Sequence, residues 1–122
     1  QKLEDQRLLG VEFKEIKYRP TGSIYHTRVP KYDSQSCGGI QLNITDRDEF
    51  NPLTTATTIM LLIHQLHPRE FQWEEGGYID KLFGTNDLRI IAAQKKPPNH
   101  LPAIWAQDVY KFNEFRQTFL IY

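Results

Sequence analysis

The order of strand-like and helix-like segments constrains the fold of this 122-residue chain more than any other feature of its sequence. Val11–Tyr18 interleaves β-branched and aromatic residues with Glu and Lys, and residues 40–45 alternate apolar with hydrogen-bonding side chains; both patterns predict strands. Helical patterns follow without a regular βαβ alternation. The sequence therefore predicts an α+β fold, in which a small mixed or antiparallel sheet packs against three to four helices.

The longest helical pattern covers residues 53–67. Asn51 is suited to the N-cap and Pro52 to the first helical position, while Pro68 ends the pattern. Apolar residues recur at steps of three and four and predict the buried face of this helix. These residues are Ala56, Ile59, Met60, Leu62, Ile63 and Leu66.

Three shorter helices are predicted after Pro68: residues 78–83, residues 86–95 and a last helix that starts at Pro102. The last helix carries a stripe of large apolar residues, which we expect to be buried. The stripe consists of Leu101, Ile104, Trp105, Val109, Phe112, Phe115 and Phe119. Asp108 and Arg116 share its phase, so we expect both to be partly buried and paired outside their own helix.

Two further strand features follow from local patterns. Val11 and Phe13 have one parity and Ile16 and Tyr18 the other, which predicts a bulge or twist in the first strand. Residues 71–73 are typical of a short strand. Only two strands are clear, and a two-stranded sheet is marginal alone, so either short segments complete the sheet or another domain covers it.

Charge and cysteine content exclude several classes of protein. Fifteen basic and fifteen acidic residues cancel, which argues against a nucleic-acid partner. The longest apolar run, residues 59–63, is far shorter than the roughly 20 residues of a membrane span. Cys37 is the only cysteine, which excludes an internal disulfide and a cysteine-rich zinc site. No cofactor is indicated.

Three polar constellations have a structural explanation that outweighs a catalytic one. His64 and His67 lie one turn apart but lack a third metal ligand, so we interpret them as ordinary residues at a helix end. The cluster Asp46, Asp48 and Glu49 is typical of a turn before a helix, because glycoside hydrolysis needs two carboxylates that face each other across a sugar.

Cys37 presents the third case. It precedes Gly38-Gly39 and could act as a nucleophile only with a base, for which His26 is the nearby candidate. A packing cysteine at a strand entrance is the favoured interpretation.

The connection between the two predicted strands, residues 19–37, is too long for a plain loop. It is rich in hydroxyl, aromatic, amide and cationic side chains, which suit a polyhydroxylated ligand as well as they suit loop anchoring. Gly38 and Gly39 remove side chains at the strand entrance, where a ligand or another backbone could come close. We expect the loop and the glycines to form one rim.

Ordered along the chain, a set of motifs resembles the C-terminal part of YbbC-like proteins, represented by the NamZ exo-β-N-acetylmuramidases. The likeness spans nearly the whole chain. The matching residues are Gly10-Val11-Glu12-Phe13, Tyr18-Arg19-Pro20-Thr21, Ser23-Ile24, Cys37-Gly38-Gly39-Ile40-Gln41-Leu42, Thr45-Asp46-Arg47, Phe50-Asn51-Pro52, His67-Pro68, Phe71-Gln72-Trp73, Leu82-Phe83-Gly84-Thr85, Leu88-Arg89, Ile104, Trp105, Asp108, Phe112, Arg116, Leu120 and Tyr122.

The resemblance implies a two-domain bacterial parent in which a Rossmann-like N-terminal domain carries the catalysis. Residues 1–10 would then be the end of a linker helix stopped by Gly10, and residues 11–122 a single C-terminal domain. The parent would be a periplasmic or secreted glycosidase that releases terminal N-acetylmuramic acid from non-reducing ends of peptidoglycan. This domain would close the cleft and be inactive alone.

The loop and Cys-Gly-Gly positions are carried over as lining of the saccharide cleft, and no catalytic residue is carried over. The candidate substrate-binding residues are Thr21, Ser23, Tyr25, Cys37, Gly38, Gly39 and Gln41. Two alternatives stay open at this point: a stand-alone carbohydrate- or peptide-binding module without catalysis, and a small thiol enzyme that uses Cys37.

Overall fold

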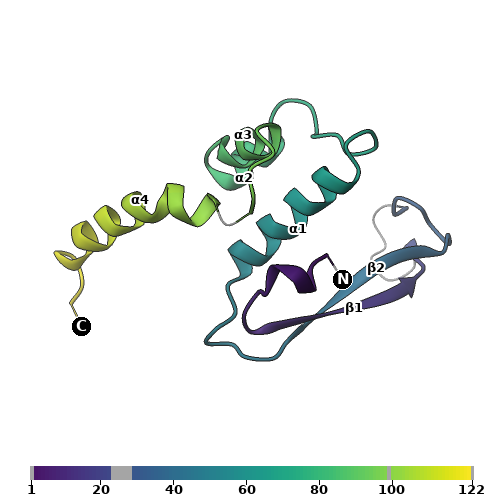
Figure 1. The fold of residues 1–122 in the computed structure, drawn as a ribbon, viewed down its shortest axis with the longest axis horizontal. Coiled ribbons are helices and arrows are strands. Elements are labelled where there is room, and N and C mark those ends of the chain that lie inside the picture. Colours follow the sequence, from purple (N-terminus) through teal and green to yellow (C-terminus); the bar gives the residue numbers. More distant parts are fainter. Residues whose placement is uncertain (1, 23–28, 99, 122) are drawn as a thin grey trace. The chain divides into compact units, whose positions relative to one another are not determined.

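The computed structural model describes residues 2–22, 29–98 and 100–121 and divides the chain into two compact units, Gln1–Phe50 and Asn51–Tyr122. The first unit holds two antiparallel strands and the second holds four α-helices (Figure 1). This arrangement confirms the predicted α+β class, and of the two forms predicted for the sheet, mixed or antiparallel, the structure has the antiparallel one. None of the helices in the described ranges is both long and apolar enough to cross a membrane.

In the first unit, β1 (Val11–Tyr18) and β2 (Cys37–Ile44) pair in one uninterrupted register that runs from Val11 opposite Ile44 to Tyr18 opposite Cys37. The bulge predicted in β1 is therefore wrong. The apolar residues of β1 instead change from one face of the ladder to the other along the strand, and on each face they lie beside residues of β2. Val11 and Phe13 share a face with Leu42 and Ile44, whereas Ile16 and Tyr18 share the other with Cys37 and Gly39.

Gly10 sets the open end of this hairpin. Its φ of 68° is in the left-handed region, and a Cβ there would lie 2.4 Å from Asp46 O and 2.6 Å from Phe50 N. The Gly10 carbonyl accepts a hydrogen bond from Thr45 N at 2.9 Å. Only glycine lets the two chain segments approach this closely. Before Gly10, the described residues hold one three-residue 3₁₀ helix, η1 (Glu4–Gln6).

In the second unit, α1 (Pro52–Leu66) begins and ends where the sequence predicts. The Asn51 side chain caps it by accepting a hydrogen bond from Thr54 N at 2.9 Å. The predicted buried face is wrong in part: Ile63 and Leu66 are exposed, and Ala56 is exposed as well. Of the predicted set, only Leu62 is buried. The other buried residues of α1 are Thr55, Thr57, Thr58 and Leu61.

Three shorter segments complete the second unit: α2 (Tyr78–Phe83), α3 (Asp87–Ala93) and α4 (His100–Gln117). The core of buried apolar side chains joins α1 to α3 and consists of Leu61, Leu88, Ile91 and Ala92. Met60, Trp73, Ile79, Phe83 and Trp105 pack around it while half-buried.

Residues 71–73 form no strand, which corrects the prediction made from their composition. The rings of Phe71 and Trp73 pack on the side chain of His64 in α1, with centroid distances of 5.3 and 5.9 Å. The two rings also meet each other edge to face at 4.7 Å. The aromatic pattern of this segment therefore serves contact with a helix rather than pairing with a sheet.

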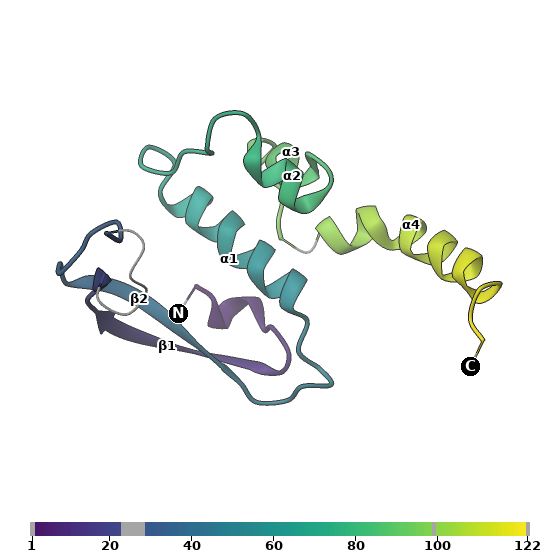
Figure 2. The same ribbon diagram turned by 180° about the vertical axis from the view of Figure 1, so that it is seen from behind.

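α4 contacts α3, and the ring of its Trp105 lies 5.8 Å from that of Phe83 in α2. Both views show its first turns near α3 and the rest leading away (Figures 1 and 2). Its apolar stripe, predicted to be buried, is largely exposed from Ile104 to Phe119. Asp108 and Arg116 are exposed too, and neither side chain forms a hydrogen bond or ion pair in the described part of the chain, so their predicted burial and pairing are wrong. The helical phase was right, but no core covers that face.

Candidate functional site

The candidate site lies at the closed end of the hairpin, where β1 passes into β2. Tyr18 and Cys37 form the last pair of the ladder, and residues 19–36 connect them. The two described arms of this connection are bonded to each other. Ser34 N donates to Pro20 O at 2.8 Å, and Gly22 N donates to Asp33 Oδ1 at 3.2 Å. These bonds keep Thr21, which is exposed, beside the strand ends.

The predicted site residues in β2 divide between the two faces of the ladder. Cys37, Gly39 and Gln41 alternate onto one face, together with Tyr18 and Ile16 of β1, while Gly38 lies on the opposite face. The Gln41 side chain is exposed, and Gln41 lies opposite Lys14, farther along β2 from the closed end of the hairpin. Ser23 and Tyr25 lie outside the described residues.

The two glycines have different surroundings. A Cβ on Gly39 would lie 2.8 Å from Cε1 of Tyr18, so the tyrosine ring covers this glycine from the neighbouring strand. A Cβ on Gly38 would meet nothing within 4 Å. Gly39 therefore leaves room for Tyr18, and Gly38 leaves an open stretch of backbone.

Cys37 is half-buried, and its Sγ lies 3.7 Å from Gln35 O within the same connection. His26, the only base proposed for a thiol mechanism, lies outside the described residues. The contact of the thiol with a carbonyl fits the interpretation of Cys37 as a packing residue.

The acidic cluster has the structural role that the sequence predicts. Asp46 Oδ1 accepts hydrogen bonds from Asp48 N at 2.9 Å and Glu49 N at 3.3 Å, which closes the turn before α1. His64 stacks on Trp73, and His67 is the C-cap of α1. No cluster of three or more metal-ligating side chains occurs in residues 2–22, 29–98 and 100–121.

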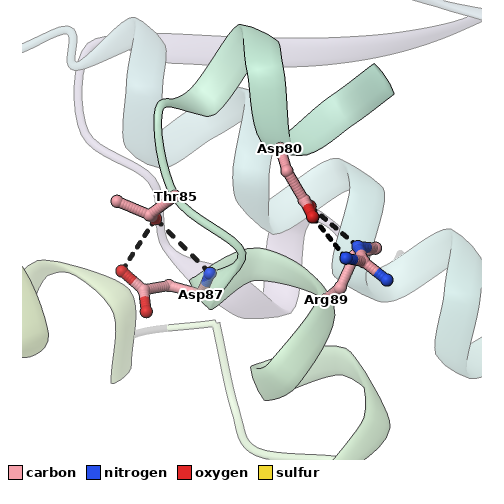
Figure 3. A network of polar contacts seen from close by, with 4 residues as sticks. All are labelled: Asp80, Thr85, Asp87 and Arg89. Carbon is pink, nitrogen blue, oxygen red and sulfur yellow. Dashed lines mark hydrogen bonds and ion pairs between the residues drawn. The ribbon is translucent and has the colours of Figure 1, made fainter. Parts of the chain in front are cut away.

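The second unit carries a polar network that joins its short helices (Figure 3). Arg89 in α3 donates through Nε and Nη2 to the two carboxylate oxygens of Asp80 in α2, the Nε bond measuring 2.7 Å. Thr85 Oγ1 donates to Asp87 Oδ2 at 2.8 Å. The same carboxylate oxygen accepts from Trp105 Nε1 at 3.2 Å, which ties α4 to α3.

The Asp80–Arg89 pair has the only resolved pKa shifts in the described ranges. The hydrogen bond from Arg89, helped by its positive charge, lowers the pKa of Asp80 below its usual value. The hydrogen bond to Asp80 raises the pKa of Arg89 in turn. Both side chains face solvent in part, so this pair orients α2 on α3 and is unlike a catalytic acid, whose pKa would be raised.

An apolar groove in the second unit is a feature that sequence reasoning missed. It encloses about 500 Å³ between the start of α1, the end of α2 and α4. Its lining includes Leu53, Leu82, Phe83, Trp105, Val109 and Phe112. Thr85 and Asp108 add polar atoms. The signal in the sequence was the stripe on the last helix, which was assigned to the core instead.

The chain is thus a small α+β domain with a polar hairpin end on one unit and an open apolar groove on the other. Residues 1–122 match the protein family described as "Exo-beta-N-acetylmuramidase NamZ, C-terminal" over their whole length. The chain belongs to this family of C-terminal domains.

A curated relative supports the same assignment. "Peptidoglycan beta-N-acetylmuramidase NamZ" of Bacillus subtilis (strain 168) is 29% identical to this chain over 120 residues. The alignment covers 98% of this chain but 27% of the relative, so the chain spans about a quarter of the length of the protein it matches. No solved structure matches the chain.

Proposed function

We propose that this domain is the cleft-closing part of a peptidoglycan glycosidase that releases terminal N-acetylmuramic acid from non-reducing ends. The observation that carries the proposal is the family match over the whole chain, joined to a relative whose name states β-N-acetylmuramidase activity. The remaining 73% of that relative has room for a catalytic domain, which we assign to a Rossmann-like N-terminal part. Peptidoglycan as substrate implies a periplasmic or secreted location.

In this proposal the closed end of the hairpin contributes substrate contacts and no catalytic group. Thr21 offers a hydrogen-bonding side chain at this end and Gln41 offers another farther along one face of β2, while the open backbone at Gly38 lets a sugar ring approach the other face. Cys37 and Gly39 support the rim through their packing, and Ser23 and Tyr25 belong to the same proposed contact set. Glycoside hydrolysis requires two opposed carboxyl groups about 5 to 10 Å apart, which the proposal places outside this domain.

The test uses the complete protein and a chromogenic N-acetylmuramic acid glycoside. We expect turnover by the complete protein, and none by residues 1–122 alone. Thr21→Ala and Gln41→Ala should each lower kcat/KM by about tenfold, the loss of one or two hydrogen bonds, with an unchanged melting temperature. Asn43→Ala is the matched control, because Asn43 lies on the same face of β2 as Gln41 but farther from the rim.

Two results would overturn the proposal. Turnover by the isolated chain would place catalysis here, and no release of muramic acid by the complete protein would remove the activity. Micromolar binding of a muramic-acid saccharide to the isolated chain, without turnover by the complete protein, would establish the stand-alone binding module instead.

A further inference from the structure

The apolar stripe of α4 exposes a large continuous apolar surface. Phe112, Phe115 and Phe119 fall within about one-sixth of a helical turn of one another, and they are 60, 63 and 67% exposed. At ~200 Å² for each side chain, they present roughly 400 Å² of apolar surface, close to the largest patch that most soluble monomers expose. Val109 and the apolar groove extend the patch further.

The wall of the groove is held in place before anything binds. Trp105 is fixed at one edge by its hydrogen bond to Asp87 and at one face by the ring of Phe83, 5.8 Å away. Asp87 is itself oriented by Thr85. A preorganised apolar surface costs little ordering entropy on binding, which favours a specific partner over accidental exposure.

The stripe carries two charged side chains that lack a partner in the described part of the chain, Asp108 and Arg116, and Asp108 is the one that lines the groove. Asp108 lines the groove between Trp105 and Phe112 and is exposed. A carboxylate at the rim of an apolar groove favours a partner that brings a basic side chain to this position. The opposite side of α4 carries Tyr110 and Glu114, and neither residue lines the apolar groove.

We infer that the α4 stripe and the apolar groove form the docking surface for another part of the same polypeptide, which presents an amphipathic apolar segment with a basic residue opposite Asp108. The partner is assigned to the same chain because 73% of the curated relative lies outside the matched region, and we assign this protein a comparable further part that is linked covalently to this domain. A covalent link gives a high effective concentration, so a patch of this size suffices for stable docking. The inference rests on the proposed function only in requiring a longer parent protein.

The experiment is hydroxyl-radical footprinting of the complete protein, read by mass spectrometry. We expect Phe112, Phe115 and Phe119 to react at least about fivefold more slowly than in the urea-unfolded protein, as buried interface residues do. Tyr110, 62% exposed on the opposite side of the same helix, is the internal control and should be slowed less than twofold, about as much as its partial exposure predicts. Slowing of the three phenylalanines by no more than that of Tyr110 would overturn the inference.

Substitutions provide a second readout. Phe112→Ser should lower the melting temperature of the complete protein by more than about 3 °C, while Tyr110→Ser should shift it by less than about 1 °C. Asp108→Lys should be more destabilising than Glu114→Lys, which reverses a charge on the opposite side. Equal effects within either pair would contradict a docked stripe.

Light scattering tests the remaining candidate for the partner, which is a second copy of the protein. If the protection disappears when a dimer is diluted to monomers, a second copy covers the stripe and the inference is wrong. Failure of the docking surface can also be distinguished from failure of the proposed enzymatic activity. An inactive complete protein with a protected stripe overturns the activity alone, and an active one with a reactive stripe overturns the docking surface alone.

Discussion

The indole Nε1 of Trp105 donates a hydrogen bond to Oδ2 of Asp87 at 3.2 Å and thereby joins the last helix to the third. This bond and the contact of Trp105 with the ring of Phe83 hold α4 where it leaves the core. Asp87 also accepts from Thr85, so one carboxylate orders both the turn before α3 and the start of α4.

Trp105→Phe tests this relationship, because phenylalanine keeps most of the apolar volume and removes the donor. We expect a loss of about 1 to 2 kcal/mol in the free energy of unfolding, measured in urea, since the acceptor is charged and partly shielded from water. Trp73→Phe is the matched control, because no hydrogen bond of the Trp73 indole occurs in the described part of the chain. A loss for Trp105→Phe no larger than for Trp73→Phe would show that packing alone fixes α4.

The glycines of β2 provide a comparison between adjacent positions. Gly38→Ala should be neutral or stabilising by about 0.5 kcal/mol, because a Cβ there meets open space and alanine restricts the unfolded chain. Gly39→Ala should be less stable than Gly38→Ala by about 0.5 to 1 kcal/mol, because its Cβ displaces the Tyr18 ring. Denaturant melts measure both values.

A double-mutant cycle identifies the cause. In a Tyr18→Ala background the difference between the two glycine substitutions should vanish, because no ring remains to be displaced. A difference that persists would mean that backbone conformation, rather than the tyrosine ring, disfavours a side chain at position 39.

Leu61 and Ile63, two apolar residues of α1, should differ strongly in how much stability is lost when each is replaced by alanine. Leu61 is fully buried in the core, so Leu61→Ala should cost about 2 to 5 kcal/mol through lost burial and a residual cavity. Ile63 is 40% exposed, so Ile63→Ala should cost less than about 1.5 kcal/mol. Comparable losses at the two positions in urea melts would show that Ile63 is covered in the folded protein.

The Asp80–Arg89 pair predicts a dependence of stability on pH. The pKa of Asp80 is lower in the folded than in the unfolded chain, so its contribution is full above the unfolded pKa of about 3.9 and is lost as pH falls through the folded value. Asp80→Asn should therefore flatten the decline of melting temperature below about pH 4. Glu75→Gln, an exposed carboxylate in the nearby turn, is the control, and an equal flattening in both variants would contradict the pair's role.

Several features of this protein follow from its sequence alone. Asn51 and Pro52 predict the start of α1, because a capping oxygen and a missing N–H suit those positions in any context. Gly84, with its φ of 80°, predicts the end of α2 in the same way. The alternation along residues 40–44 predicts β2, and the ordered motifs predict the family. These signals are local, so they hold whatever packs against them.

Only the tertiary structure decided which faces are buried. Periodicity shows which residues share a side of a helix, but it does not say whether anything covers that side. The core formed by α3 is narrow and meets α1 at Leu61, which leaves Ile63 and Leu66 outside it. Thr57 can be buried there because its hydroxyl bonds to the carbonyl oxygens of Leu53 and Thr54 within its own helix.

The last helix shows the same limit most clearly. Its sequence predicts an amphipathic helix with one aromatic face, and the structure confirms the helix but leaves Phe112, Phe115 and Phe119 exposed. The spacing of apolar residues determines which of them share one side of a helix. Whether that side is buried depends on the other segments that pack against it. In this domain, the described residues do not bury the aromatic side of α4.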